Sequence, residues 1–254
     1  MELPKRLQQI AFFVEQGDSL ADVGTDHGLL PVFLVLSGKI KRAIATDIAS
    51  GPCQAARNTI RRHGLNEAIE VRLGPGLAPL QRGEVNTLVL AGMGGSTALS
   101  ILTAHPEIAQ TAHRWIVQPM NNGDKLRAYF RSLGFPISDE TWLEENGRLY
   151  QVMTVCTVRD VGTSEALYRD YTHPEAEWFA YSFGPLAVNR SGLVEEAVVQ
   201  TKKQLMDIVV QLARGRNPVA VEQRSIFQRR LNWLTEWLKS RGDVMQVVRE
   251  KSPS

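Results

Sequence analysis

Two carboxylates and two glycines share one short stretch near the amino terminus, which reads Asp22-Val23-Gly24-Thr25-Asp26-His27-Gly28. It follows a predicted strand and precedes a predicted helix, which is where open α/β sheets bind ligands. Gly24 and Gly28 allow a sharp turn and a close approach of the backbone to a ligand. The dinucleotide fingerprint G-x-G-x-x-G has a glycine where Asp26 stands, and a carboxylate there would repel a pyrophosphate. The pattern therefore favours a ligand with cationic groups, such as S-adenosylmethionine, which carries an ammonium and a sulfonium.

Three later stretches, each predicted to follow a strand, carry residues that suit the same ligand. Asp47 ends the second strand, and a carboxylate there can accept hydrogen bonds from both hydroxyls of a ribose. Gly74-Pro75-Gly76-Leu77 would form a narrow loop for an adenine, and Ala91-Gly92-Met93-Gly94-Gly95 would lie beside the reacting group. Because the carboxyl ends of parallel strands share one edge of a sheet, we expect a single cofactor site. Its predicted residues are Asp22, Gly24, Gly28, Asp47, Gly74, Gly76, Leu77, Ala91, Gly92, Met93 and Gly94.

The elements that must position these residues alternate between short β-rich runs and helix-like runs, a pattern typical of a doubly wound α/β sheet. The predicted strands are Ser19–Val23, Arg42–Thr46, Ile69–Leu73, Thr87–Ala91, Trp115–Val117 and Tyr150–Thr157. The predicted helices are Leu3–Glu15, Pro31–Leu36, Cys53–His63, Ala98–His105 and Lys125–Leu133. Asn146-Gly147 favours a tight turn, so Ile137–Glu145 and Leu149–Val158 are expected to form a closing antiparallel hairpin.

The character of the chain changes after Asp160. Asp160–Ser164 is small and polar and is expected to be a linker. Two apolar stripes at helical spacing follow, separated by Gly215-Arg216-Asn217-Pro218, and they predict an antiparallel helical hairpin. The stripes are Leu205, Ile208, Val209 and Leu212, then Ile226, Phe227, Leu231, Leu234 and Leu238. We therefore expect an α/β domain over residues 1–160 and a helical, coiled-coil-like tail over residues 161–254.

Composition narrows the class of protein less than the motifs do. The 254 residues are 43% hydrophobic and 22% charged, as in an ordinary soluble globular chain. The 29 basic and 27 acidic residues give a net charge of +2, which neither identifies nor excludes a nucleic-acid partner. No apolar run predicts a membrane span, and no signal peptide is recognisable. Cys53 and Cys156 are too few for a disulfide framework or a cysteine-rich zinc site, so we expect no metal and a reducing, cytoplasmic compartment.

These motifs together resemble the bacterial tRNA (adenine(22)-N(1))-methyltransferase family. The matching stretches are Ala21–His27, Asp47, Gly51-Pro52, Gly64-Leu65, Gly74–Leu77, Ala91–Gly95, Gln118-Pro119, Glu145–Tyr150 and Phe183-Gly184-Pro185. The resemblance covers nearly the whole chain and implies a Rossmann-like methyltransferase domain, S-adenosylmethionine as cofactor and a coiled-coil-like tail. It departs from the family at Pro75, where a polar residue is common, and at Met120, where asparagine is frequent.

The implied reaction is methyl transfer to N1 of an adenine in tRNA, at position 22 by resemblance. N1 of neutral adenine carries a lone pair, and the ring becomes cationic as the new bond forms. A carboxylate nearby would stabilise that charge and could take a proton from the exocyclic amine. Asp26 is the predicted catalytic residue for this role, with His27 as a second candidate. No asparagine-proline-proline-aromatic loop of the exocyclic-amine methyltransferases is present, which favours a ring nitrogen as acceptor.

A tRNA substrate needs basic contacts, and two sets of residues are candidates. The amino-terminal basic set is Lys39, Lys41, Arg42, Arg57, Arg61 and Arg62, for which a solvated helix face is an equal interpretation. The tail basic set is Lys202, Lys203, Arg214, Arg216, Arg224, Arg229 and Arg230. Trp233 and Trp237 could stack a base, although packing within the helical hairpin is the simpler interpretation.

Two other functions remain open at the level of sequence. A nicotinamide-dependent oxidoreductase would use the same fold, and Asp26 argues against it. A non-catalytic RNA-binding module could keep the fold without turnover, and Pro75 is the residue that favours this alternative. The sequence does not determine the oligomeric state.

Overall fold

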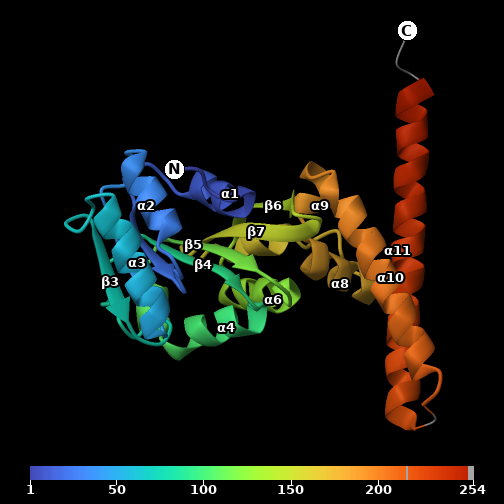
Figure 1. Ribbon diagram of the computed structural model, residues 1–254. Helices are drawn as coiled ribbons and strands as arrows, with labels where there is room; N and C mark the ends of the chain where they lie inside the picture. Colours follow the sequence, from blue (N-terminus) through green and yellow to red (C-terminus); the bar gives the residue numbers. More distant parts are fainter. Residues whose placement is uncertain (216, 251–254) are drawn as a thin grey trace.

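The computed structural model describes residues 1–215 and 217–250, which form a mixed sheet with helices on both faces and a helical arm at one end (Figure 1). The strand order is β3-β2-β1-β4-β5-β7-β6. The first five strands pair in parallel, and β7 pairs antiparallel with both β5 and β6. The strands are β1 (Ser19–Val23), β2 (Arg42–Asp47), β3 (Ile69–Leu73), β4 (Thr87–Met93), β5 (Arg114–Pro119), β6 (Ile137–Glu145) and β7 (Arg148–Cys156).

Two apolar layers bury the two faces of this sheet. Helices α1 (Lys5–Phe13), α2 (Leu29–Leu36) and α3 (Ser50–Arg62) cover one face, and α4 (Gly95–Ala104), α5 (Pro106–Ala109) and α6 (Gly123–Leu133) cover the other. Strand β1 shows the alternation that this requires: Leu20 points into the first layer, while Ala21 and Val23 point into the second. Because both faces are covered, the central strands are apolar on both sides.

The predicted α/β pattern is confirmed, and the differences lie mainly at element ends. Strand β4 extends two residues beyond the predicted Ala91, and α3 begins three residues before the predicted Cys53. The expected linker Asp160–Ser164 is wrong, because residues from Val161 onward form α7 (Val161–Ala166). The Asp160 carboxylate accepts a hydrogen bond from the Thr163 N–H and so caps this helix.

In the described residues that follow β7, every regular element is a helix. After α7 come α8 (Pro174–Phe183) and α9 (Ala187–Arg190), two short helices that the sequence patterns did not predict. Helices α10 (Leu193–Leu212) and α11 (Pro218–Glu250) then form the predicted antiparallel hairpin, and α11 extends well beyond α10 (Figure 1). Leu205 and Leu234 lie in its core, as the two stripes predicted. Arg216, within the predicted break, lies outside the described residues.

None of the helices in residues 1–215 and 217–250 combines the length and the apolar composition that crossing a bilayer requires. The same residues contain no group of three or more histidine, cysteine, aspartate or glutamate side chains placed to hold a metal ion.

Candidate functional site

The predicted site residues converge at the carboxyl edge of the sheet, where β1 lies between β2 and β4. The chain connections run in opposite directions from this seam, which makes it the topological switch point of the sheet. A cavity of about 180 Å³ opens there. Of the residues predicted from the sequence it is lined by Asp22, Gly24, Asp26, His27, Ala91 and Gly92.

The loop after β1 has the conformation that its glycines predict. Gly24 and Gly28 both have positive φ, +77° and +68°, and a Cβ on Gly24 would come within 3.2 Å of the Met93 methyl carbon. The N–H groups of Gly24 and Thr25 both donate to the carbonyl oxygen of Thr46, at 2.8 and 2.9 Å. The loop is therefore fastened to the end of β2 and packed against the end of β4.

Asp22 is the buried carboxylate of this loop, with 6% of its surface exposed. Its Oδ2 accepts a hydrogen bond of 2.6 Å from the Thr25 hydroxyl. Burial raises the pKa of Asp22 from its ordinary 3.8 to about 6; Thr25 opposes this rise, Asp47 adds to it and the positive charge of Arg6 lowers it. A buried carboxylate with a raised pKa at a switch point is suited to a cationic ligand group.

Asp47 stands at the end of β2, beside the same loop. Its Oδ2 accepts from the Asp26 N–H at 3.3 Å and its Oδ1 from the Ala49 N–H at 3.0 Å, so the carboxylate has a fixed orientation. The next residue, Ile48, is 73% exposed, and Leu73 at the end of β3 is 55% exposed. Two exposed apolar side chains thus lie at neighbouring strand ends, and the sequence patterns did not single them out.

The loop after β3 is held against the end of β2. The Gly74 N–H donates to the Asp47 carbonyl oxygen at 2.9 Å, and Gly76 lies against Ile101. Leu77 was predicted to contact a cofactor, but its side chain is fully buried in the core, so only its backbone could do so. The loop returns along β3 towards β4.

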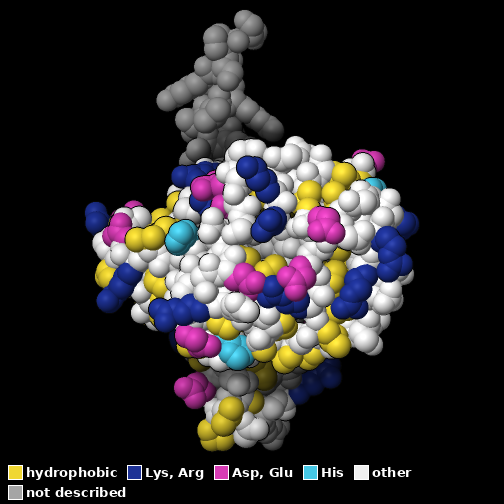
Figure 2. Space-filling model, turned by 90° about the vertical axis from the view of Figure 1, so that its left-hand side faces the viewer, with side chains coloured by type: hydrophobic (Ala, Val, Ile, Leu, Met, Phe, Trp, Pro, Cys, Tyr) yellow, Lys and Arg dark blue, Asp and Glu magenta, His cyan; other side chains and the backbone are white. Residues whose placement is uncertain are grey.

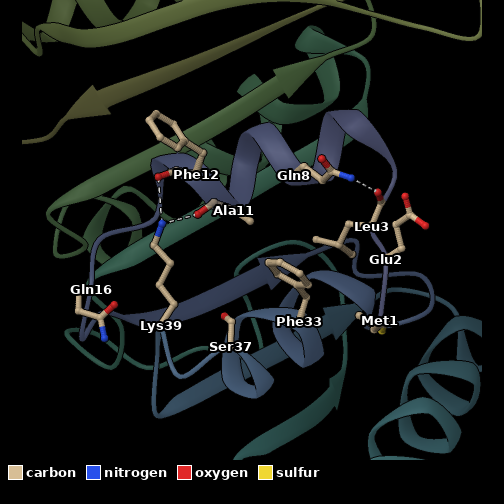
Figure 3. Close-up of a pocket in the computed structure, with 10 residues that line it drawn as sticks. All are labelled: Met1, Glu2, Leu3, Gln8, Ala11, Phe12, Gln16, Phe33, Ser37 and Lys39. Carbon is tan, nitrogen blue, oxygen red and sulfur yellow. Dashed lines mark hydrogen bonds between the residues drawn. The ribbon is translucent and has the colours of Figure 1, made fainter.

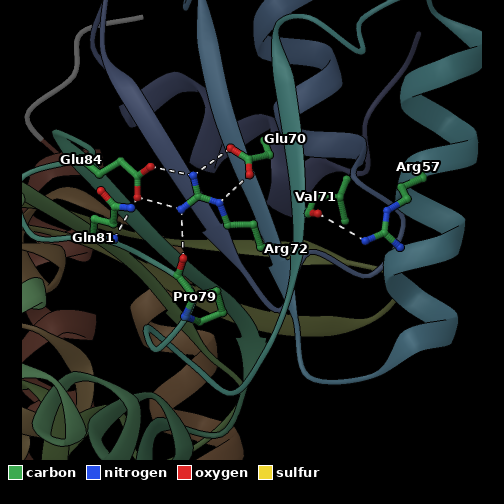
Figure 4. Close-up of polar contacts among 7 residues, drawn as sticks. All are labelled: Arg57, Glu70, Val71, Arg72, Pro79, Gln81 and Glu84. Atoms are coloured by element: carbon green, nitrogen blue, oxygen red, sulfur yellow. Dashed lines mark hydrogen bonds and ion pairs between the residues drawn. The ribbon is translucent and has the colours of Figure 1, made fainter.

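Arg72 fastens this returning loop (Figure 4). Its guanidinium donates to Glu70, to Glu84 and to the carbonyl oxygen of Pro79. Its hydrogen bonds hold the pKa of Glu70 and of Glu84 below the ordinary glutamate value. One side chain of the edge strand therefore joins both ends of the loop that carries Gly74 and Gly76.

Backbone contacts between two loops shape the wall beyond Ala91. The Gly92 N–H donates to Gln118 Oε1 at 3.0 Å, and the Gly95 N–H donates to the Asn121 carbonyl oxygen at 2.9 Å. A Cβ on Gly95 would lie 2.6 Å from that oxygen, so only glycine allows the β4 and β5 loops to approach so closely. Gly94 precedes α4, and Met93 packs into the core beside Gly24. The Gly-Met-Gly-Gly motif thus brings the loop after β5 into the site.

Arg6 on α1 is a site residue that sequence reasoning missed. It lines the cavity, and its Nη1 would lie 3.4 Å from a Cβ placed on Gly92. Among the described residues that line this cavity, Arg6 is the one with a permanent positive charge. Its Nε lies 3.6 Å from Glu145 Oε2, and the backbone N–H of Arg6 donates to Glu145 Oε1 at 3.2 Å. The sequence predicted only a helix there, since nothing local shows that its first turn reaches the site.

Asp26 and His27 lie at the mouth of the cavity rather than inside it. Their side chains are 70% and 58% exposed, and His27 Nε2 lies 3.6 Å from Asp26 Oδ2. Asp26 has φ = +55°, an uncommon backbone conformation for a residue with a side chain. Such strain is often retained at functional sites. The position allows Asp26 to meet a group that enters from solvent.

The amino-terminal basic set does not face this site. Lys39, Lys41, Arg42, Arg61 and Arg62 lie at or near the ends of α2 and α3 and the start of β2, which is the amino edge of the sheet and opposite to the cavity. Lys39 donates to the carbonyl oxygens of Ala11 and Phe12 at the end of α1, inside a separate groove of about 860 Å³ between α1 and α2 (Figure 3). The view onto the β3 and α3 end shows basic side chains interspersed with acidic and apolar ones (Figure 2).

The tail residues divide into two groups. Arg229 Nε bonds Glu175 at 2.7 Å, and Arg230 lies over the Trp178 ring, so both are engaged within the tail. Trp233 stacks on His173, and Trp237 packs on Phe179, which supports the packing interpretation of both tryptophans. The remaining members of the tail basic set that the structure describes, Lys202, Lys203, Arg214 and Arg224, are exposed or partly exposed.

The chain is similar in sequence and in structure to known proteins. Residues 3–153 match a family model described as a methyltransferase domain. The chain is 36% identical over 168 residues to the tRNA (adenine(22)-N(1))-methyltransferase of Bacillus subtilis, covering 66% of this chain and 69% of that protein. The crystal structure of the B. subtilis tRNA methyltransferase TrmK superposes with a TM-score of 0.82 at 29% identity, covering 93% of this chain and 99% of that one.

A putative tRNA methyltransferase from Streptococcus pneumoniae, solved in complex with S-adenosyl-L-methionine, is also similar. It superposes with a TM-score of 0.77 at 32% identity and covers 93% of this chain and all of that one (100%). The match extends beyond the Rossmann-like domain into the helical tail in both solved structures. The chain therefore belongs to the tRNA (adenine(22)-N(1))-methyltransferase family.

Proposed function

We propose that this chain transfers a methyl group from S-adenosylmethionine to N1 of adenine 22 in tRNA, the activity named for its B. subtilis relative. The observation that carries the proposal is the pair of opposite charges at the switch-point cavity. Asp22 and Arg6 would bind the ammonium and the carboxylate of the methionine end of the cofactor. A dinucleotide would instead place a pyrophosphate beside two carboxylates, Asp22 and Asp26, which weakens the nicotinamide alternative.

The residues at the cavity and at the two neighbouring strand ends have the chemistry to hold the three parts of the cofactor. The oriented carboxylate of Asp47 would accept the ribose hydroxyls, and the exposed side chains of Ile48 and Leu73 would cover the adenine ring. Where the family commonly has a polar side chain, Pro75 in the loop after β3 would contribute backbone and apolar contacts to the adenine. When bound, S-adenosylmethionine supplies an electrophilic methyl group on its sulfonium.

The protein's part in the reaction is mainly positioning and charge. The small residues of the glycine loop Gly92–Gly95, on which residues Gln118–Asn122 pack, would leave room for a flat base. Asp26 at the mouth would stabilise the positive charge that develops on the adenine ring, and its carboxylate could accept the proton from the exocyclic amine. His27 lies beside Asp26 and would orient that carboxylate or share the proton.

The experiment that tests the proposal is transfer from labelled S-adenosylmethionine to unmodified tRNA, followed by nucleoside analysis and sequencing. Label in 1-methyladenosine at position 22 would support the assignment. S-adenosylhomocysteine binding without any label in tRNA would instead favour the non-catalytic RNA-binding alternative. Label at another base or position would overturn the substrate assignment.

Arg6→Gln is expected to weaken S-adenosylhomocysteine binding by about 10- to 150-fold, because a charge-assisted bond to the carboxylate of the ligand contributes about 1.5–3 kcal/mol. Isothermal titration calorimetry measures the change. Lys5→Gln, on the preceding exposed residue, is the matched control and should leave the dissociation constant unchanged. Equal affinities for the wild type and for Arg6→Gln would remove Arg6 from the site.

The triple variant Lys202→Gln, Lys203→Gln, Arg214→Gln is expected to lower tRNA affinity by about tenfold or more. The slope of log K against log salt concentration should become shallower by about 2–3, because a protein that makes fewer phosphate contacts releases fewer counterions when it binds. The control is the triple variant Lys41→Gln, Arg61→Gln, Arg62→Gln. It removes the same number of positive charges from the amino edge of the sheet, which is opposite to the cavity. Filter binding at several salt concentrations compares the two. A stronger effect from the control would assign tRNA binding to the amino-terminal basic set.

A further inference from the structure

A buried ion pair lies where the sheet meets the carboxyl-terminal helices. Arg127 on α6 donates from Nε to Glu140 Oε2 on β6 at 3.0 Å, and their side chains are 0% and 1% exposed. Buried ion pairs contribute little to stability on balance, because apolar replacements of similar shape are often as stable. The pair is therefore best understood through the groups that it holds in place.

Each partner also binds the end of a helix in the tail. Glu140 Oε1 accepts from the N–H groups of Leu186 and Ala187, at 2.6 and 3.2 Å, where α9 begins. Arg127 donates to the carbonyl oxygen of Tyr181, at 2.9 Å, in the last turn of α8. An anion at a helix start and a cation at a helix end both match the partial charges of the backbone there. The pair thus reaches both sides of the α8–α9 corner.

The corner itself is shaped to fit the pair. Gly184, between the two helices, has φ = +92°, and a Cβ on it would overlap the Glu140 carboxylate. The Trp142 indole N–H donates to the Phe183 carbonyl oxygen at 2.8 Å. The motif Phe183-Gly184-Pro185, one of the stretches that resemble the family, is therefore held on β6 by directed hydrogen bonds. Such bonds fix an orientation, whereas apolar packing alone allows sliding.

The corner supports the α10–α11 hairpin. Side chains of α8 and α9 share one apolar cluster with the hairpin, and Arg241 on α11 donates to the Val188 carbonyl oxygen. The buried members of this cluster are Phe179, Phe183, Ala187, Val188, Val194, Ala197, Val198, Leu205 and Leu234. Any rotation of the corner on β6 would therefore move the whole hairpin.

On its other side, the ion pair is connected through α6 to the loop after β5, which contacts the glycine loop Gly92–Gly95. We call this glycine loop the methyl-transfer loop. Helix α6 begins at Gly123, about one turn before Arg127, and follows the loop that contains Asn121. Asn121 in turn accepts the N–H of Gly95 in the glycine loop. One rigid helix thus connects the loop beside the target base with the ion pair that holds the tail.

We propose that Arg127 and Glu140 are positioning residues for tRNA, which hold the α10–α11 hairpin at a fixed orientation to the methyl-transfer loop. The inference rests on the proposed function, in which the hairpin binds the body of the tRNA. A tRNA bound by the hairpin then presents its target adenine at the cavity, and a displacement of about 1 Å at that point costs about a hundredfold in rate. Neither residue touches the cofactor.

The test compares full-length tRNA with a short RNA hairpin that bears the target adenine. In the full-length protein, Glu140→Gln and Arg127→Met are expected to lower kcat/KM for tRNA at least about tenfold and to leave kcat/KM for the short hairpin within about twofold. S-adenosylhomocysteine affinity should also stay within about twofold. A loss that is equal for both RNAs would overturn the proposal, because it would indicate damage to the catalytic domain.

A second comparison separates positioning from loss of stability. The double variant Arg127→Met, Glu140→Gln removes both buried charges together, so its melting temperature should approach that of the wild type. Its defect on full-length tRNA should persist, since methionine cannot bond the Tyr181 carbonyl oxygen. Ile60→Ala, in the core under α3 at the far end of the sheet, is the destabilised control. It should lower the melting temperature without changing the ratio between the two RNAs.

Failure of the proposed function is distinguishable from failure of this inference. If the wild type methylates neither RNA, the reaction itself is wrongly assigned. If it methylates tRNA far better than the short hairpin and the double variant keeps that preference, then Arg127 and Glu140 do not position the tail.

Discussion

Asp22→Asn is expected to stabilise the ligand-free protein at pH 7.5 while it weakens cofactor binding. Asp22 is buried, and its pKa is raised from 3.8 to about 6, so the folded protein binds this proton more tightly than the unfolded chain does. The ionised carboxylate therefore costs folding free energy. The cost is absent below about pH 3.8, grows as the pH rises towards 6 and is constant above that. A shift of about two units corresponds to about 3 kcal/mol as an upper bound.

The same substitution removes the negative charge that would face the cofactor's ammonium. We expect S-adenosylhomocysteine affinity to fall at least about tenfold at pH 7.5, since a charge-assisted hydrogen bond is lost. In the wild type the affinity should decline by up to about tenfold per unit below pH 6, because binding requires the ionised carboxylate, and the asparagine variant should lack this decline.

Differential scanning fluorimetry and calorimetry at pH 7.5 and pH 5 measure both effects. Asparagine can still accept the Thr25 hydroxyl bond, so the loop keeps its contact. Glu67→Gln, at an exposed position on the opposite edge of the sheet, is the control and should change neither quantity. A variant that is less stable at every pH and binds S-adenosylhomocysteine normally would contradict the assignment of Asp22.

Asp26→Asn is expected to lower kcat by about 10²–10³-fold, the range seen when one group that stabilises transition-state charge is removed. Asparagine is the informative substitution because it tolerates the left-handed backbone, φ = +55°, that Asp26 adopts. Alanine would add strain to a loop whose N–H binds Asp47, and so would confuse catalysis with cofactor binding. The asparagine variant should therefore retain its affinity for S-adenosylhomocysteine.

Single-turnover methylation of tRNA with saturating cofactor measures the loss directly. His27→Gln serves for comparison and should have a smaller effect, because His27 would act through or beside the Asp26 carboxylate. Wild-type turnover in Asp26→Asn would show that the carboxylate takes no part in the reaction. The charge on the ring would then have to be stabilised by the base-binding loops.

The sequence predicted the strands and the glycine-containing loops after them well, since their signals are local. A strand buried on both faces is a short apolar run, and a glycine with positive φ must be present where the loop turns. Helices α7, α8 and α9 were not predicted because their stability depends on distant partners. Arg131 on α6 bonds Glu165 and Glu177, and Glu140 binds the start of α9. The periodicity of apolar residues along the chain does not predict such contacts between distant polar side chains.

The errors at the site have the same origin. Arg6 reaches the cavity only because α1 crosses the sheet with its first turn at the carboxyl edge. Leu77 follows two loop glycines, yet its side chain points into the core. The amino-terminal basic set looked continuous along the chain, but the ends of α2 and α3 lie at the edge opposite to the cavity. Each case depends on the direction in which an element crosses the sheet, which spacing along the chain does not encode.

The seam between β1 and β4 also has a consequence for the order in which the protein folds. Leu20 pairs with Thr87 across this seam, so a long intervening segment must be closed before these strands meet. The β6–β7 hairpin is joined by a tight turn and forms from neighbouring residues. The seam is therefore expected among the later contacts to form, and the cavity lies on it. A cofactor that binds there would stabilise a contact that forms late, so cellular cofactor supply would influence how long newly made chains remain exposed to proteases.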